Sequence, residues 1–196
     1  MHRTPAAFLA FALLASSVTA SAATLTVDVR TPRGEAVPDA VVYAIPEGRV
    51  VPPARKTAVM DQKNRMFVPH VLAVQTGTGV RFPNSDDIRH QVYSFSTAKT
   101  FQLPLYKGTP ARPVVFDKAG VATLGCNIHD RMTAYVVVVD TPHFGTAGKQ
   151  GRVTLESLPA GKYTVRLWYP EMRTEPAPLT VTLSGNDRSA LSFSTR

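Results

Sequence analysis

The sequence predicts an all-β protein in which short strands pack as β-sandwiches. Its 196 residues include 16 prolines and 12 glycines, a composition that favours frequent turns between short elements. Apolar and polar residues alternate in short runs, as they do in half-buried strands, and no window keeps the 3.6-residue period of an amphipathic helix. Hydrophobic residues make up 44% and charged residues 18%, an ordinary globular composition with enough apolar surface for a packed core.

The predicted strands fall into three groups separated by two irregular segments. The first segment, residues 46–56, contains three prolines, and the second, residues 142–150, is rich in Gly, Thr and Pro. Residues 136–139 are four consecutive valines, which is typical of a strand buried on both faces. In chain order the predicted strands are residues 25–29, 40–44, 71–74, 79–82, 91–95, 114–116, 121–124, 133–140, 152–155, 162–168, 179–183 and 190–193.

The first 23 residues have the three-part pattern of a secretory signal peptide. A short basic start that ends at Arg3 precedes an apolar run over residues 6–15, which is too short to span a membrane. Residues 20–22 and 21–23 both fit the small-x-small rule for cleavage, whereas a buried N-terminal helix would not need this order of segments. The pattern predicts export to the periplasm and a mature protein without an integral membrane segment.

The charge of the chain restricts its partners. Lys and Arg number 22 against 14 Asp and Glu, so the formal net charge is +8. Such an excess suits acidic proteins or anionic membrane surfaces, although a solvated surface can carry it without any docking role. The basic residues are scattered and form no cluster with aromatic side chains, which argues against nucleic acid as a partner.

Cys126 is the only cysteine of the chain. Exported proteins usually pair their cysteines, but a single cysteine cannot form an internal disulfide. The thiol of Cys126 is therefore an inert core group, a reactive group or a metal ligand. Its neighbours in the sequence favour the third interpretation.

The segment from Cys126 to Met132 has the spacing Cys-x2-His-x2-Met and lies directly before the four-valine strand. It brings a thiolate, the imidazole of His129 and a thioether to one short loop. Two imidazoles and a thiolate with a weak axial thioether form a set that copper accepts in both oxidation states. The second imidazole is predicted to be His90, which follows the strand-ending turn at residues 82–86. The predicted metal ligands are thus His90, Cys126, His129 and Met132, around one copper ion.

Other site chemistries fit these residues less well. Zinc would prefer a fourth thiolate or a harder ligand over the thioether of Met132. A Cys–His hydrolase needs an oriented base and an oxyanion hole, which the sequence does not suggest, so we expect no catalytic residues and no enzyme activity. His70 lies beside a strand and could line the core or the rim, but the ligand set is complete without it.

A further series of motifs occurs in order along the chain, at residues 67–69, 77–78, 80–84, His90, 116–120 and 125–132. Over about residues 56–140 these motifs resemble the cupredoxin family, including plastocyanin and amicyanin. The order F-x-P-H-V-L followed by C-N-I-H most resembles the group called methylamine utilization proteins. The resemblance implies a Greek-key cupredoxin sandwich with a type 1, or blue, copper ion. It also implies single-electron transfer between redox protein partners, with His129 near the surface as the electron port.

The segments on either side carry a second resemblance. Residues 34–42, 151–155 and 158–165 are similar to the two ends of a carboxypeptidase regulatory-like domain. The expected organisation is a signal peptide at 1–23, an immunoglobulin-like sandwich from 24–46 plus 142–196, and a cupredoxin copper domain at 47–141. Two rival functions stay open: a periplasmic copper carrier or delivery protein, and a β-sandwich binding module with the copper domain as an accessory.

Overall fold

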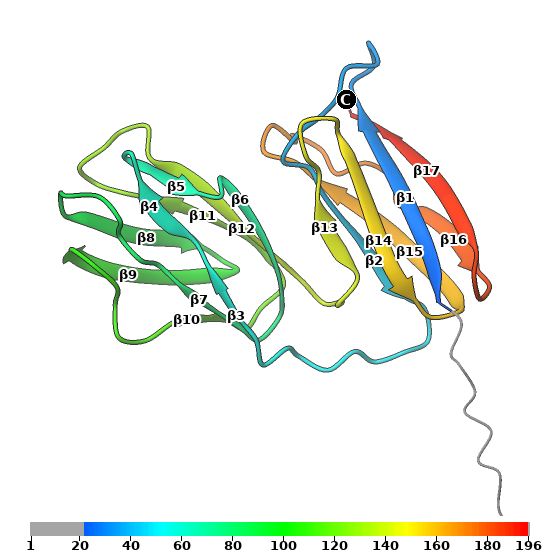
Figure 1. The fold of residues 1–196 in the computed structure, drawn as a ribbon, viewed down its shortest axis with the longest axis horizontal. Coiled ribbons are helices and arrows are strands. Elements are labelled where there is room, and N and C mark those ends of the chain that lie inside the picture. Colours follow the sequence, from blue (N-terminus) through cyan, green and yellow to red (C-terminus); the bar gives the residue numbers. More distant parts are fainter. Residues whose placement is uncertain (1–21, 196) are drawn as a thin grey trace, which may run out of the picture.

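The computed structural model describes residues 22–195, which consist of strands and connecting loops. The predicted all-β class is confirmed. Figure 1 shows two sandwiches side by side, formed by β3–β12 and by β1, β2 and β13–β17. Residues 22–195 contain no helix that is long and apolar enough to cross a membrane. The predicted signal peptide lies outside the described residues except for Ala22 and Ala23.

The sandwich built from β3–β12, here called the central sandwich, has a five-stranded sheet in the order β6-β12-β11-β8-β9. A three-stranded sheet, β10-β7-β3, faces it, and β4 and β5 form a separate hairpin. This arrangement is consistent with the predicted Greek key. The strands are β3 (Thr57–Val59), β4 (Asp61–Lys63), β5 (Met66–Val68), β6 (Val71–Gln75), β7 (Thr78–Arg81), β8 (His90–Ser96), β9 (Lys99–Tyr106), β10 (Val114–Phe116), β11 (Gly120–Gly125) and β12 (Thr133–Val139).

The flanking sandwich pairs the start of the chain with its end. Its sheets have the orders β14-β1-β17 and β13-β2-β15-β16, and β1 runs parallel to β17 but antiparallel to β14. In β1 every second residue is buried, as the alternation in the sequence predicts. The strands are β1 (Ala23–Arg30), β2 (Val41–Pro46), β13 (Phe144–Thr146), β14 (Arg152–Leu158), β15 (Gly161–Trp168), β16 (Leu179–Leu183) and β17 (Arg188–Ser194).

Five strands of the structure were not predicted from the sequence: β3, β4, β5, β9 and β13. Four of them have only three residues, too few to show a period of two. The fifth, β9, has eight residues but contains Pro104 and is half-exposed along its length. It is the last strand of its sheet, where a proline that donates no hydrogen bond is tolerated.

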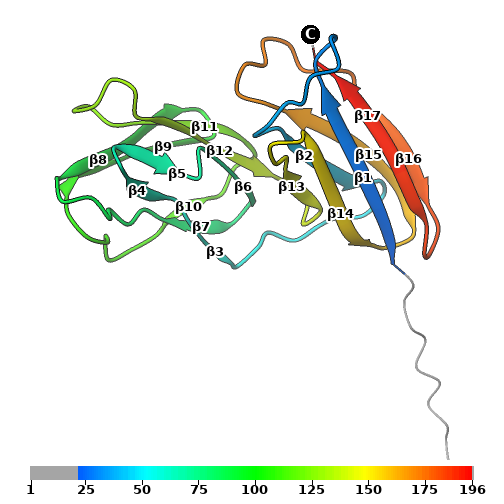
Figure 2. The ribbon, with the colours of Figure 1, turned by 45° about the horizontal axis from the view of Figure 1, so that its top comes forward.

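The four valines of β12 are buried on both faces, as predicted, by two different cores. Val136 and Val138 point into the core of the central sandwich. Val137 and Val139 belong to a second cluster that includes Val41 of β2, so they face the flanking sandwich. Each strand face is thus covered, and the two sandwiches share an apolar junction. Figure 2 shows β12 of the central sandwich next to β13 of the flanking one.

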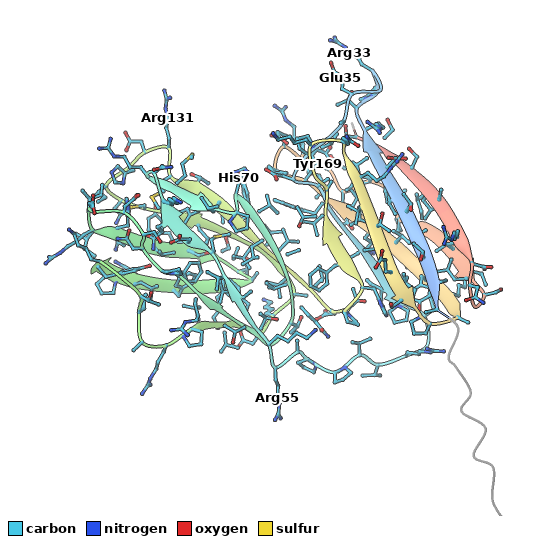
Figure 3. The ribbon with its side chains drawn as sticks, in the orientation of Figure 1. Arg33, Glu35, Arg55, His70, Arg131 and Tyr169 are labelled. Atoms are coloured by element: carbon cyan, nitrogen blue, oxygen red, sulfur yellow. The ribbon has the colours of Figure 1, made fainter. Side chains whose placement is uncertain are left out.

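Polar and aromatic contacts also cross this junction. The ring of Tyr135 lies 5.2 Å from that of Trp168, measured between centroids. The Nδ1 atom of His70 lies 3.1 Å from an oxygen of Asp39, and its ring meets Tyr135 edge to face. Figure 3 shows His70 at the side of the central sandwich that faces the flanking one. The structure therefore gives His70 a place in the junction.

Candidate metal centre

Two adjacent strands bring the predicted ligands together at one end of the central sandwich. Cys126 directly follows β11, and His90 is the first residue of β8. These strands are hydrogen-bonded neighbours, with Gly125 opposite Tyr93. His129 lies in the loop between β11 and β12, where its carbonyl accepts a 3.0 Å hydrogen bond from the amide of Met132. That bond forms a tight turn at the end of the loop, directly before β12.

The donor atoms of three side chains converge on one point. The Sγ atom of Cys126 lies 4.0 Å from Nδ1 of His90 and 4.0 Å from Nδ1 of His129. All three donor atoms are within 4.8 Å of one another. The imidazole rings are 4.9 Å apart between centroids and inclined at 55°. A metal ion placed between these atoms would contact one thiolate and two imidazole nitrogens.

The site is buried on one side and open on the other. His90 is fully buried and Cys126 is 5% exposed, whereas His129 is half-buried. Met132 is 1% exposed and lines the same hollow as Cys126 and His129, which has a volume of about 280 Å³. The loop that contains His129 therefore separates the thiol from solvent.

The electrostatics of this end of the sandwich favour neutral imidazole at His129. Desolvation by burial lowers its pKa, and the electrostatic interactions with Arg65 and with the neighbouring His90 act in the same direction. The carboxylates of Asp86 and Asp130 oppose this shift without reversing it. A neutral imidazole has a free lone pair, which is the form that binds a metal ion.

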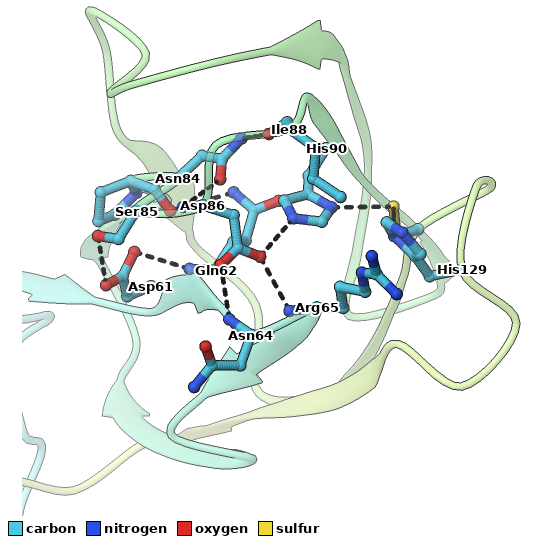
Figure 4. Close-up of polar contacts among 12 residues, drawn as sticks. Asp61, Gln62, Asn64, Arg65, Asn84, Ser85, Asp86, Ile88, His90 and His129 are labelled. Carbon is cyan, nitrogen blue, oxygen red and sulfur yellow. Dashed lines mark hydrogen bonds and ion pairs between the residues drawn. The ribbon is translucent and has the colours of Figure 1, made fainter.

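A carboxylate that the sequence reasoning missed supports His90 from behind. The Oδ2 atom of Asp86 lies 2.7 Å from Nε2 of His90, the ring nitrogen that faces away from Cys126. Backbone amides of Asn64 and Arg65, in the turn between β4 and β5, donate to the same carboxylate at 2.6 and 2.8 Å (Figure 4). The sequence does contain a signal for this contact, because Asp86 lies four residues before the predicted ligand His90. The two hydrogen bonds from the hairpin could be recognised only in the folded structure.

Hydrogen bonds from buried polar groups hold the loop that leads to His90 in place. The side-chain amide of Asn84 donates to the carbonyls of Ile88 and Tyr106, and its oxygen accepts from the amide of Asp86. The Tyr106 hydroxyl donates to the Phe82 carbonyl at 2.6 Å, and desolvation raises the pKa of this hydroxyl to about 12. These bonds join β7, β9 and the loop before β8, so the position of His90 is set by the protein.

The donor set fits copper better than other ions. One thiolate and two imidazoles with a nearby thioether are the ligands of blue-copper sites, whereas structural zinc sites use four strong donors. Of the predicted ligands, the structure brings His90, Cys126 and His129 together and places Met132 in the wall of the same hollow. His70 is absent from this cluster within the described residues 22–195.

Comparison with known proteins gives matches only among solved structures. No protein-family model and no curated protein matches the chain. A copper-containing nitrite reductase from Thermus scotoductus is 23% identical, with a TM-score of 0.41, and the match covers 43% of this chain and 23% of that one. The present chain thus corresponds to less than a quarter of the reductase chain.

Two smaller proteins are matched over nearly their whole length. A purple cupredoxin from Nitrosopumilus maritimus is 22% identical with a TM-score of 0.37, and the match covers 42% of this chain and 99% of that one. A reduced amicyanin variant is 22% identical with a TM-score of 0.39, and the match covers 50% and 99% of the two chains. At these identities the likeness concerns the fold.

Proposed function

We propose that this protein is a periplasmic electron carrier of the cupredoxin type, with one copper ion held by His90, Cys126, His129 and Met132. The observation that carries the proposal is the convergence of two imidazole Nδ1 atoms and one thiol sulfur within 4.8 Å of one another. Bound copper would supply a one-electron couple between Cu(II) and Cu(I). The side chains named here would hold the ion, and no catalytic residue is proposed.

Core packing supports a site that keeps its shape. Cys126 and Met132 belong to the same buried cluster as Phe116 and Val136, and His90 has no exposed surface. Ligands fixed by packing need little rearrangement when the charge of a bound ion changes, which suits electron transfer. A copper delivery protein would instead need a ligand set that opens toward its acceptor.

The loop that contains His129 is the proposed contact surface for redox partners. His129 is the least buried of the three converging ligands, and the neighbouring Ile128 side chain is 48% exposed. Arg65 and Arg131 are exposed around it, and Arg131 extends away from the body of the sandwich in Figure 3. Loss of Arg3 with the signal peptide would leave 21 Lys and Arg against 14 Asp and Glu, a net charge of +7. Together with this charge, these groups favour an acidic redox protein as the partner.

We also propose export by the signal peptide predicted at residues 1–23, and a copper domain at 47–141 between the two parts of the flanking domain, 24–46 and 142–196. Ala23 is the first residue of β1, is fully buried and pairs with Leu158 of β14. Cleavage after Ala22 would therefore leave β1 complete, whereas cleavage after Ala23 would remove its first residue.

The proposed copper site is tested most directly by its colour. Protein loaded with one equivalent of Cu(II) is expected to show an intense visible band from charge transfer between sulfur and copper, because Cys126 is the thiolate donor. Cys126→Ser keeps the size of the side chain but removes the sulfur, so the band is expected to disappear. Visible absorption and electron paramagnetic resonance spectra measure both proteins.

Met132→Leu is the companion variant, since Met132 would be the weak thioether donor to bound copper. It is expected to keep copper and colour and to raise the reduction potential, because a donor to Cu(II) is lost. A colourless copper complex of the unaltered protein, or colour that persists in Cys126→Ser, would contradict the type 1 assignment.

A second test separates electron transfer from copper delivery. The reduced protein is expected to keep its copper when mixed with a moderate Cu(I) chelator, because core packing holds the ligands. Electron exchange with a small acidic redox protein should be fast and should slow as salt is added, because screening weakens steering by the positive charge. Chelator titration and stopped-flow absorption measure the two properties. Rapid loss of Cu(I) together with slow electron exchange would favour the delivery function.

A further inference from the structure

The imidazole of His90 connects the metal centre to a carboxylate. Its Nδ1 atom faces the Cys126 sulfur at 4.0 Å, and its Nε2 atom lies 2.7 Å from Oδ2 of Asp86. The His90 side chain is 0% exposed and that of Asp86 is 14% exposed, so water competes little for this contact. The ring therefore has one nitrogen for the metal and one for the carboxylate.

The carboxylate is held in place by a short hairpin turn. The Asn64 amide donates to Oδ1 of Asp86 at 2.6 Å, and the Arg65 amide donates to Oδ2 at 2.8 Å (Figure 4). Both turn residues have positive φ angles, 56° and 59°, which are those of a tight two-residue hairpin turn. Left-handed backbone is unfavourable for Arg65. The turn thus accepts an uncommon conformation in which both amides point at the carboxylate.

These bonds favour the ionised carboxylate. The carboxylate accepts hydrogen bonds from the amides of Asn64 and Arg65 and lies 2.7 Å from Nε2 of His90, and hydrogen bonds of this kind favour the charged form over the neutral acid. An anion that accepts a hydrogen bond from a ligand imidazole fixes which ring nitrogen bears the proton. It also increases the electron donation of the other nitrogen to the metal. Stronger donation stabilises the more highly charged metal ion more than the less charged one.

We propose that Asp86 is a positioning residue of the metal centre that keeps the proton of His90 on Nε2 and lowers the reduction potential of bound copper. The effect on the potential rests on the proposed copper function. The effect on the imidazole proton does not, because it follows from contacts that are present without metal. Asp86 touches no metal ion in this scheme and acts only through His90.

The first experiment uses the metal-free protein. Long-range proton–nitrogen correlation spectra distinguish the two neutral forms of a histidine, at a pH well above the usual imidazole pKa of about 6.5. The unaltered protein is expected to show His90 with its proton on Nε2. This measurement needs neither copper nor a variant. A proton on Nδ1 would overturn the proposal whatever the result for copper.

The second experiment compares Asp86→Asn with Asp87→Asn. Both lose one negative charge, but Asp87 is exposed and is the next residue in the chain. In Asp86→Asn we expect mixed His90 proton forms and a loss of Cu(II) affinity of about 10- to 100-fold, with a smaller loss for Cu(I). Each tenfold excess of the Cu(II) loss over the Cu(I) loss raises a one-electron potential by about 59 mV.

The control decides between a specific contact and a general charge effect. Asp87→Asn is expected to leave the His90 spectrum unchanged and to move the potential much less than Asp86→Asn does. Equal shifts in the two variants, or an unchanged potential in Asp86→Asn, would overturn the assigned role. A protein that binds no copper would contradict the proposed function, while the metal-free spectrum would still test the role of Asp86 in placing the proton.

Discussion

Phe116→Ala is expected to lower the free energy of unfolding of the metal-free protein by about 3–5 kcal/mol. Phe116 has no exposed surface, and its ring meets that of Phe101 edge to face at 6.0 Å. Removing the ring would leave a cavity in the cluster that also contains Cys126 and Met132. Urea unfolding followed by fluorescence or circular dichroism measures the change, and the metal-free form avoids stabilisation by bound ion.

Phe95→Ala is the matched control, because Phe95 lies in the same sandwich but is 75% exposed. Its free energy of unfolding is expected to stay within about 0.5 kcal/mol of the unaltered protein. Phe116→Ala should also weaken the retention of Cu(I) against a chelator, since the ligands would lose packed support. Equal free energies of unfolding for Phe116→Ala and Phe95→Ala would show that burial of Phe116 does not stabilise the core of the central sandwich.

Val41→Asp is expected to destabilise the protein by about 4 kcal/mol or more, because it buries an unpaired charge. Val41 is fully buried in the cluster that joins the two sandwiches, beside Val71, Val137 and Val139. Each sandwich also has a core of its own. We therefore expect one thermal transition in the unaltered protein and two in the variant, measured by differential scanning calorimetry.

Val115→Asp controls for the substitution itself. Val115 lies in β10 and is 47% exposed, so a carboxylate there can stay hydrated. The Val115→Asp variant is therefore expected to keep a single thermal transition at nearly the temperature of the unaltered protein. A single transition at an unchanged temperature in Val41→Asp would contradict the role of the buried junction in stabilising the protein and coupling the two sandwiches.

The strand β12 was predicted from its sequence, but the partners of its two faces were not. Four consecutive valines predict a strand buried on both faces, and the structure confirms this. The sequence could not show what covers each face, because apolar residues carry no information about their partners. Only the fold places Val136 and Val138 against the central core and Val137 and Val139 against the flanking sandwich.

The strands that the sequence missed have a common physical reason. A strand is recognised by alternation over several residues, and β4 and β5 have only three residues each. Their hairpin is nevertheless the element that holds Asp86 through the amides of Asn64 and Arg65. Backbone amides have no signature in a sequence, so their role in the site could not be predicted.

The sequence by itself determined the chemistry available at the site. The spacing Cys126-x2-His129-x2-Met132 predicts a chelating loop, because three donors so close in the chain can turn to one side before a buried strand. It also predicts an all-β fold, because alternation and frequent turns are local properties. The tertiary structure alone decided that His90 meets Cys126 at 4.0 Å and that Asp86 lies behind it. Cys126 and His90 are 36 residues apart, and their contact depends on the pairing of β8 with β11. Such pairing is fixed by packing between distant segments, which local patterns do not encode.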